Sequence, residues 1–183
     1  MNTTENPWGI IDSKEIYDNP WINVKEYNVI NPNGGKGIYG KVHFKNIAIG
    51  ILAIDENQET ILIGQFRFPL NAYSWEIPEG GGKLSVDPLE SAKRELLEET
   101  GLKANKWSEL LVMHLSNSVS DEKAIIYLAE DLKQFEAEPE ETEKLEIKKL
   151  PFEKVYEMVM NSEITDSMSV AAILKYKLLS IHK

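Results

Sequence analysis

The amino-acid sequence predicts an α+β fold, or a sandwich built on a mixed β-sheet. The order of the patterns is the first reason, because β-like segments come first, one helix follows, and further strands precede two closing helices. The second reason is the run from 46 to 54, which is apolar on both faces and is typical of a central strand. The third is a helix over 88–100 with clear signals at both ends.

The first residues, 1–45, predict a small β subdomain ahead of a main domain over 46–183. Residues 21–29 and 37–44 alternate in short β-like pieces. Between them, the Asn-Pro-Asn-Gly-Gly sequence at 31–35 is typical of a turn. We therefore expect a hairpin within the subdomain.

The main domain is expected to begin with a second hairpin. Its strands cover 47–54 and 60–66, and the turn residues 55–57 join them. Later elements are expected as strands at 109–114, 124–129 and 145–150 and as helices near 152–161 and 167–180.

The helix predicted over 88–100 has recognisable start and stop signals. Asp87 is a good N-cap, and Pro88 suits the first helical position. Glu90 follows Asp87 at the spacing of a capping box. Gly101 supplies the residue that ends the helix.

Three carboxylates of this helix, Glu95, Glu98 and Glu99, have the spacing that places side chains on one helix face. They repel one another, and only Arg94 stands beside them. The opposite face is apolar and can pack on a core, through Leu89, Ala92 and Leu96. The carboxylates therefore either form a solvated helix face or bind cations, and oxygen ligands suit Mg²⁺ or Mn²⁺.

The segment Glu76–Gly82, just before the helix, is expected to be a loop. Its glycines permit backbone conformations that other residues resist, so the chain can pass close to a ligand. A backbone carbonyl of this loop can serve as a further metal ligand.

Composition and charge narrow the class of protein. The 183 residues are 42% hydrophobic and 27% charged, which is the balance of a soluble globular protein. No apolar run approaches the roughly 18 residues of a membrane span, and the N-terminus does not resemble a secretory signal. The absence of Cys fits a cytoplasmic protein. The net charge of −10 argues against binding nucleic acid through a broad basic surface.

One spacing resembles the signature of the Nudix hydrolases. Gly80 is followed, after thirteen residues, by Arg94-Glu95-Leu96-x-Glu98-Glu99-x-Gly101-Leu102. The segments 66–69, 75–81 and 164–174 extend the resemblance to the branch that hydrolyses ADP-ribose and other nucleoside diphosphate sugars. One position departs from the usual signature, since Val86 stands where a Glu is expected.

The resemblance implies an α/β/α sandwich with a mixed sheet. In this branch the N-terminal β subdomain is usually exchanged within a homodimer, and the base of the substrate often binds there. The resemblance also implies that Glu95 and Glu99 bind Mg²⁺, with Mn²⁺ as an alternative. Glu98 would be a further ligand or would support one, and the carbonyl of Glu79 would complete the metal's shell. Arg94 would hold the helix carboxylates in place.

The general base of this branch often comes from a loop well after the helix. The acid-rich stretch 136–146 is the candidate loop. Alignment on the strand that follows it puts Glu141 at the base position and Glu143 as an accessory metal ligand, with Glu140 as the alternative base. A solvated acidic loop is the competing interpretation.

Five residues are candidates for substrate contacts. Arg67 ends a strand before the glycine loop and could grip a phosphate, although it could equally be an ordinary surface arginine. Glu76 belongs to the same region, and Glu122 lies in a loop expected to border the site. Tyr27 and Trp21 could stack on a base, but aromatic residues in strands more often belong to a core.

The function that follows is Mg²⁺-dependent hydrolysis of the diphosphate bond of a nucleoside diphosphate sugar, such as ADP-ribose or GDP-mannose. The products would be a nucleoside monophosphate and a sugar phosphate. Dinucleoside polyphosphates and damaged nucleotides are alternative substrates. Val86 supports another alternative, a Nudix module that binds a nucleotide sugar without cleaving it. A purely structural interaction protein is the third possibility.

Overall fold

The computed structural model describes residues 5–135 and 145–181. The chain forms two compact units. The N-terminal unit comprises the chain up to Asn46 together with Ser116–Glu122, and the main unit comprises Ile47–Leu115 and Lys123–Lys183. No helix in the described part of the chain is both long and apolar enough to cross a membrane.

The N-terminal unit is a three-stranded antiparallel sheet in the order β1-β2-β3. Its strands are β1 (Gly9–Asp18), β2 (Ile22–Ile30) and β3 (Lys36–Phe44). The hairpin predicted from the second and third strands is present, with Tyr27 opposite Tyr39. The segment Ser116–Glu122 joins the sheet at Val42, whose amide donates to the carbonyl of Val119 at 2.9 Å.

Strand β1 was not expected from the sequence. Its register against β2 shifts between Ile10 and Asp12 and again between Glu15 and Tyr17. Each shift breaks the strict alternation of side chains by which a strand is recognised in a sequence. All ten of its residues are exposed, so no apolar face marks the strand either.

The main unit contains a four-stranded sheet and a three-stranded sheet. The first has the order β7-β4-β9-β8, with β4 (Asn46–Ala53), β7 (Glu79–Lys83), β8 (Leu102–His114) and β9 (Lys123–Gln134). The second has the order β10-β5-β6, with β5 (Glu59–Arg67), β6 (Ala72–Glu76) and β10 (Glu146–Pro151). Because β9 is parallel to β4 and antiparallel to β8, the four-stranded sheet is mixed, and β4 lies in its interior as predicted.

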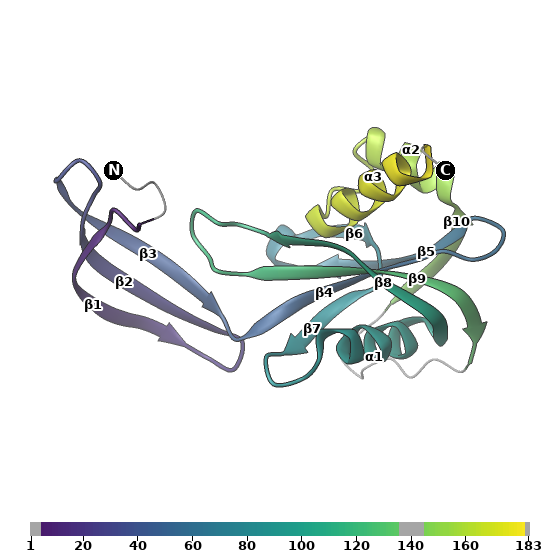
Figure 1. Ribbon diagram of the computed structural model, residues 1–183, viewed down its shortest axis with the longest axis horizontal. Helices are drawn as coiled ribbons and strands as arrows, with labels where there is room; N and C mark the ends of the chain where they lie inside the picture. Colours follow the sequence, from purple (N-terminus) through teal and green to yellow (C-terminus); the bar gives the residue numbers. More distant parts are fainter. Residues whose placement is uncertain (1–4, 136–144, 182–183) are drawn as a thin grey trace. The chain divides into compact units, whose positions relative to one another are not determined.

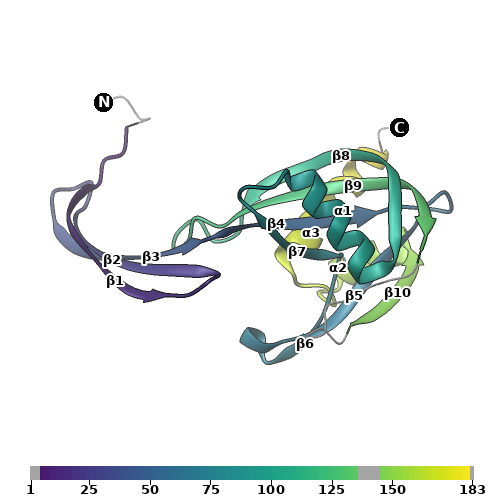
Figure 2. The ribbon, with the colours of Figure 1, turned by 90° about the horizontal axis from the view of Figure 1, so that it is seen from below.

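Three helices complete the main unit, α1 (Pro88–Thr100), α2 (Phe152–Met160) and α3 (Ser167–Ile181). A short 3₁₀ turn, Phe68–Leu70, joins β5 to β6. Helix α1 covers one face of the strands, and α2 and α3 cover the opposite face (Figures 1 and 2). The predicted α/β/α arrangement is therefore confirmed.

Alternation along the strands builds a core on each face. On β4, Ile49 and Ile51 pack in the cluster that contains Leu96 of α1. Leu52, on the opposite side of the same strand, packs in the cluster that contains Ile173 of α3. The run 46–54 is apolar on both faces because it is buried between two helical layers.

The predicted ends of α1 are correct. The Asp87 side chain accepts a hydrogen bond from the Leu89 amide at 2.8 Å, and Pro88 is the first helical residue. Gly101 has a φ of 70° and caps the helix through its amide. Glu90, expected to complete a capping box, instead pairs with Lys93 at 2.7 Å.

The segment between β6 and α1 is more regular than the sequence suggested. Glu76 is the last residue of β6, and residues 79–83 form the edge strand β7, where a loop was expected. A strand rich in glycine carries no alternating apolar pattern, so sequence alone does not reveal it. β8 also begins at Leu102, earlier than predicted.

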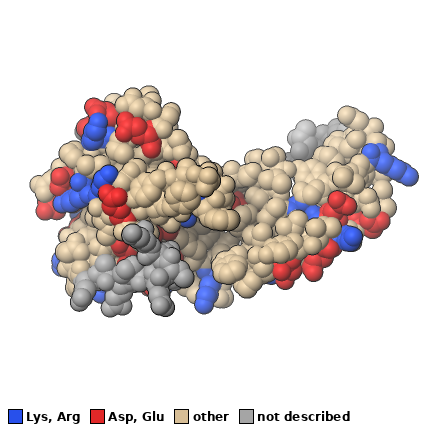
Figure 3. All heavy atoms as spheres, turned by 180° about the vertical axis from the view of Figure 1, so that it is seen from behind, with Lys and Arg blue, Asp and Glu red and all other residues tan. Residues whose placement is uncertain are grey.

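Charges of both signs are interspersed on the face drawn in Figure 3, and no broad basic patch is visible there. This mixture of charges on one face accompanies a net charge of −10 for the whole chain.

The Asp121 carboxylate should make the N-terminal unit sensitive to acid. Partial burial raises the pKa of Asp121, but hydrogen bonds from Lys41, His43 and the Phe44 amide outweigh burial and lower it from 3.8 to about 2. A lowered folded-state pKa contributes stability above the unfolded-state pKa, and that stability is lost as the pH falls through the folded-state value. We expect Asp121→Asn to lower the unfolding midpoint near neutral pH, and this difference to vanish between about pH 4 and pH 2.

The measurement is chemical unfolding of both proteins across this pH range. Asp12→Asn is the matched control, because the Asp12 carboxylate accepts from the Asn28 amide group rather than from a cation. A difference between wild type and Asp121→Asn that stays constant into acid would contradict the prediction.

Candidate active site

The carboxylates of α1 are not a solvated helix face. Glu95 and Glu99 are only 9% and 4% exposed, while Glu98 is half-buried. A buried carboxylate is costly unless a cation or hydrogen bonds compensate it. The interpretation of Glu95 and Glu99 as ordinary surface residues is therefore wrong.

Arg94 lies on the same helix and contacts its acidic neighbours. One guanidinium nitrogen, Nη1, pairs with Glu98, and Nη2 pairs with Glu95. Nη2 also approaches the carbonyl of Gly81 at 3.3 Å. Burial lowers the pKa of Arg94, but the charges of Glu95 and Glu98 outweigh burial and raise it, so the side chain stays cationic. These are the contacts expected of a residue that holds helix carboxylates in place.

The backbone of residues 77–79 lies against α1 and is fixed at each peptide. The Glu79 amide donates to Oε2 of Glu99 at 3.1 Å. The Ile51 amide of β4 donates to the carbonyl of Pro78 at 2.8 Å. The Ile77 amide donates to Oγ of Ser169 at 2.9 Å. Strand β4 and helices α1 and α3 thus each hold one point of this segment.

Gly80, the next residue, lies close to Glu95 of the helix. A Cβ atom at residue 80 would lie 2.3 Å from the carboxyl carbon of Glu95 and 2.4 Å from its Oε1. Glycine is therefore required there if the Glu95 carboxylate is to keep its position. For the position of the Glu95 carboxylate, this close approach of Gly80 matters more than the conformational freedom of the neighbouring glycines, Gly81 and Gly82.

A second acidic group surrounds Arg67. Carboxylate oxygens of Glu76, Glu79 and Asp166 all lie within 4.8 Å of one another. Nε and Nη2 of Arg67 donate to Glu76 at 3.0 and 2.5 Å, and Nη2 also pairs with Glu79. Burial lowers the pKa of Arg67, but Glu76, Glu79 and Asp166 raise it above its usual value. Arg67 is therefore a permanent cation in the middle of this group.

Glu79 is the member of this group whose carboxylate charge is least offset by cations and hydrogen bonds. Burial raises its pKa well above the usual range, the charges of Asp166 and Glu76 raise it further, and Arg67 opposes them. Its Oε2 atom is buried and has no hydrogen-bond partner among the described residues. Since Arg67 already bridges Glu76 and Glu79, we interpret this group as a support for the segment 77–79.

The residues at α1 fit a divalent cation. Nudix proteins generally use one, and the donors here are carboxylate oxygens and a backbone carbonyl, which hard cations prefer. Two of the carboxylates, Glu95 and Glu99, are buried, so their oxygens are held in the interior beside this backbone. The gap left for Glu95 by the missing Cβ of Gly80 keeps its carboxylate against the backbone that would supply the carbonyl.

Of the remaining predicted site residues, some belong to the part of the chain that the structure describes and three do not. Glu140, Glu141 and Glu143, the candidates for the general base, lie outside the described residues. Glu122, Tyr27 and Trp21 belong to the N-terminal unit. The Val86 side chain is 42% exposed, just before the N-cap of α1.

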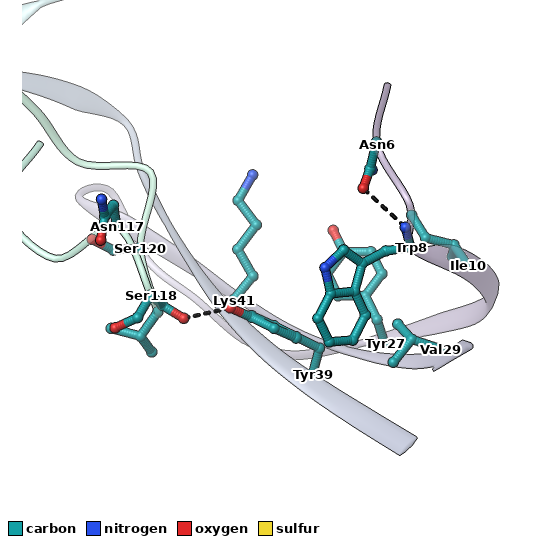
Figure 4. A pocket seen from close by; sticks show the side chains of 11 residues that line it. Asn6, Trp8, Ile10, Tyr27, Val29, Tyr39, Lys41, Asn117, Ser118 and Ser120 are labelled. Atoms are coloured by element: carbon teal, nitrogen blue, oxygen red, sulfur yellow. Dashed lines mark hydrogen bonds between the residues drawn. The ribbon is translucent and has the colours of Figure 1, made fainter. Parts of the chain in front are cut away.

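The N-terminal unit has a pocket of about 420 Å³ within its own residues. Figure 4 shows the side chains of Trp8, Tyr27 and Tyr39 close together in it, with Lys41 beside them. The Trp8 and Tyr39 rings meet edge to face with centroids 5.3 Å apart, and the Tyr39 hydroxyl donates to the carbonyl of Ser118 at 2.6 Å. Trp21 does not line this pocket and is 65% exposed.

Sequence reasoning missed Asp166 and Ser169 as parts of the site. Both lie in the segment 164–174 that carried the family resemblance, but only as a closing helix. Asp166 precedes Ser167, the first residue of α3, and its Oδ2 accepts from the Ser169 amide at 2.7 Å, as an N-cap does. The capping pattern at Asp166 can be recognised in the sequence. The packing of the start of α3 beside Glu76 and Glu79 cannot, because it depends on the tertiary structure.

Comparisons with known proteins agree with this geometry. Residues 44–167 match the NUDIX domain family, and residues 8–42 match the family of nucleoside diphosphate sugar hydrolase N-terminal domains. The chain belongs to the Nudix family. The predicted family and an enzyme of the Nudix type are thereby confirmed.

Relatives of similar length carry pyrophosphatase names. An ADP-ribose pyrophosphatase of Bacillus subtilis (strain 168) is 30% identical over 89% of this chain and 89% of its own. An ADP-ribose pyrophosphatase of Mycobacterium tuberculosis is 29% identical over 93% of this chain and 83% of its own. A GDP-mannose pyrophosphatase of Yersinia pestis (strain Pestoides F) is 27% identical over 88% of this chain and 87% of its own.

A solved structure shares the fold. The crystal structure of an ADP compounds hydrolase superposes with a TM-score of 0.86 and covers 97% of this chain and 96% of its own. At 21% identity this likeness supports the fold alone.

Replacing Gly80 should damage the site more than the fold. In Gly80→Ala the new Cβ displaces the Glu95 carboxylate, a flexible end that can move at small cost in stability. We expect little change in the unfolding midpoint but a loss of about tenfold or more in metal-dependent turnover. Gly40→Ala is the matched control, since a Cβ there meets nothing within 4 Å. Equal turnover of the Gly80→Ala and Gly40→Ala proteins would contradict the assignment of Glu95.

Removing Arg67 should destabilise the main unit. In Arg67→Met the Glu76 carboxylate, 2% exposed, and the Glu79 carboxylate lose their shared cation. Since 34% of the Arg67 side chain is exposed, solvent screens part of the loss, and we expect about 1–3 kcal/mol. Adding Glu79→Gln should recover part of it, because a buried amide at residue 79 needs neither a cation nor a proton to be neutral. Urea unfolding of the three proteins measures both effects, and an additive double variant would refute the coupling.

Proposed function

We propose that this chain hydrolyses the diphosphate bond of nucleoside diphosphate sugars to a nucleoside monophosphate and a sugar phosphate. The observation that carries the proposal is the pair of buried carboxylates, Glu95 and Glu99, held against the backbone of residues 79–81. The family matches over both parts of the chain and the pyrophosphatase names of its relatives support the same reaction.

Mg²⁺ is the proposed cation, with Mn²⁺ as an alternative. Glu95 and Glu99 would hold it, with Glu98 and the carbonyl of Glu79 as further oxygen donors. When bound, the cation neutralises charge on the diphosphate and lowers the pKa of the attacking water. Arg94 keeps the carboxylates of Glu95 and Glu98 in place through its ion pairs.

Arg67 is the proposed phosphate contact. Its guanidinium is anchored by Glu76 and Glu79 through Nε and Nη2. Within the described part of the chain its Nη1 has no recorded acceptor, so this nitrogen can donate to an anionic oxygen of the substrate. Glu76 then acts on the substrate through the orientation of Arg67, since its own side chain is buried.

The residue that takes the proton from water is proposed to lie in the acidic stretch after β9. Glu141 remains the first candidate and Glu140 the second, with Glu143 as an accessory metal ligand. A general base must come within hydrogen-bonding distance of the attacking water. Single Glu→Gln variants at these three positions would identify it by the largest fall in kcat.

The base of the substrate is proposed to bind the aromatic pocket of the N-terminal unit. Tyr27 lines that pocket beside Trp8 and Tyr39, so a stacked ring would find aromatic partners there. Trp21 lies outside it, which favours Tyr27 over Trp21. Glu122 belongs to the same unit, where burial raises its pKa; its proposed substrate contact remains a hypothesis.

Val86 supports the competing function, a module that binds a nucleotide sugar without cleaving it. Its exposed position ahead of α1 leaves Glu95, Glu99 and Arg94 in place, so the structure favours an enzyme over that alternative. Dinucleoside polyphosphates and damaged nucleotides remain alternative substrates. A homodimer and a cytoplasmic location are further parts of the proposal, and light scattering of the purified protein tests the first.

The test is a turnover screen over nucleoside diphosphate sugars with ADP-ribose and GDP-mannose included, with and without Mg²⁺. A phosphatase coupled to phosphate detection reports the phosphomonoester products. We expect Mg²⁺-dependent turnover, a fall of about 10²-fold or more in Glu99→Gln, and little change in Glu90→Gln. Glu90 is the matched control because it is an exposed carboxylate of the same helix.

Two outcomes would contradict the proposal. Binding without turnover on every substrate would favour the non-catalytic module. Full activity of Glu99→Gln would refute the assignment of the metal site, even if the wild type hydrolyses a substrate.

A further inference from the structure

The backbone of residues 77–79 donates one of its hydrogen bonds to helix α3. That bond joins the Ile77 amide to Oγ of Ser169 at 2.9 Å, between residues 92 positions apart. The Pro78 carbonyl accepts a hydrogen bond from the Ile51 amide of β4, and the Glu79 amide donates one to the Glu99 carboxylate. Because Pro78 has no amide hydrogen, the Ile77 and Glu79 amides are the donors through which this segment can be held.

The Ser169 contact is completely buried. Ser169 and Ile77 are both 0% exposed, so water does not compete for the Ile77 amide. A buried amide that loses its acceptor is expensive, and the backbone shifts rather than leave it unpaired. The position of the Ile77 peptide is therefore set by the position of the Ser169 hydroxyl.

Ser169 is itself fixed by the start of its helix. Its amide donates to Oδ2 of Asp166 at 2.7 Å. A carboxylate oxygen of Asp166 also lies within 4.8 Å of Glu76 and Glu79. Since Met168 and Ala172 anchor α3 in the core beside Ser169, the hydroxyl stands on a rigid part of the helix.

We propose that Ser169 is a positioning residue for the metal site. Its hydroxyl holds the Ile77 peptide, and the fixed φ of Pro78 transmits that position along the chain. The Glu79 carbonyl, which would be a ligand of the cation, is thereby held in place. The part of this inference that concerns the cation rests on the proposed function. The part that concerns the backbone of residues 77–79 does not.

The obvious test is Ser169→Ala, with Ser169→Thr as the conservative variant that keeps the hydroxyl. Ile173→Val is the matched control, because Ile173 is fully buried on the same helix and packs in the same core, and its truncation should lower stability without touching the Ile77 amide. All three are made in the full chain.

The first readout is hydrogen exchange at the Ile77 amide, followed by NMR. We expect exchange to accelerate in Ser169→Ala more than at core amides of α3, and to remain slow in Ser169→Thr and Ile173→Val. The second readout is Mn²⁺ affinity, measured by the paramagnetic signal of the free ion. Loss of an indirect support of a metal ligand typically weakens binding about 10–100-fold, and we expect this in Ser169→Ala with most affinity restored in Ser169→Thr.

A third readout separates positioning from general destabilisation. In Ser169→Ala, kcat at saturating substrate should fall while KM changes little, and raising the Mn²⁺ concentration should recover part of the loss. Ile173→Val should leave kcat unchanged. Unchanged exchange at Ile77, or equal Mn²⁺ affinity in Ser169→Ala and Ile173→Val, would overturn the inference.

The first two readouts, exchange at the Ile77 amide and Mn²⁺ affinity, do not depend on the proposed reaction. If the wild type cleaves no nucleotide sugar, the proposed function fails, yet exchange at Ile77 and Mn²⁺ binding still decide the role of Ser169. If turnover is present but Ser169→Ala behaves as Ile173→Val, the proposed function stands and the positioning role is wrong.

Discussion

The hydrogen bond between the Glu79 amide and the Glu99 carboxylate is the contact on which the candidate site depends. It joins the segment before α1 to the helix itself, at 3.1 Å. The segment can come so near only because Gly80 has no side chain where the Glu95 carboxylate lies. Two buried carboxylates and a backbone carbonyl are thus gathered in one place by a single close approach.

The cost of this arrangement is repulsion among carboxylates, which two arginines offset. Arg94 pairs with Glu95 and Glu98 on the helix, and Arg67 bridges Glu76 and Glu79 on the adjacent strands. Burying charge without a partner would cost several kcal/mol per ion, on the order of the whole stability of a small domain. The site therefore trades stability for a fixed set of oxygen donors, a pattern common at functional sites.

Sequence predicted the elements whose local signals agree with their surroundings. Helix α1 was placed correctly because Asp87 and Gly101 mark its ends, and β4 because burial on both faces leaves an apolar run. Strands β1 and β7 were missed, since register shifts in one and glycines in the other remove the alternating pattern. The contacts of Asp166 and Ser169 with the segment 77–79 depend on tertiary packing, which no local pattern encodes.

In the proposed reaction, water attacks a phosphorus atom of a diphosphate at this site. Hydrolysis of ADP-ribose in ¹⁸O-labelled water with Mg²⁺, followed by mass spectrometry, tests it most directly. We expect AMP and ribose 5-phosphate, with one labelled oxygen in the phosphate of one product, and loss of the reaction in Glu99→Gln. Products without label in either phosphate, or a labelled reaction that persists in Glu99→Gln, would contradict it.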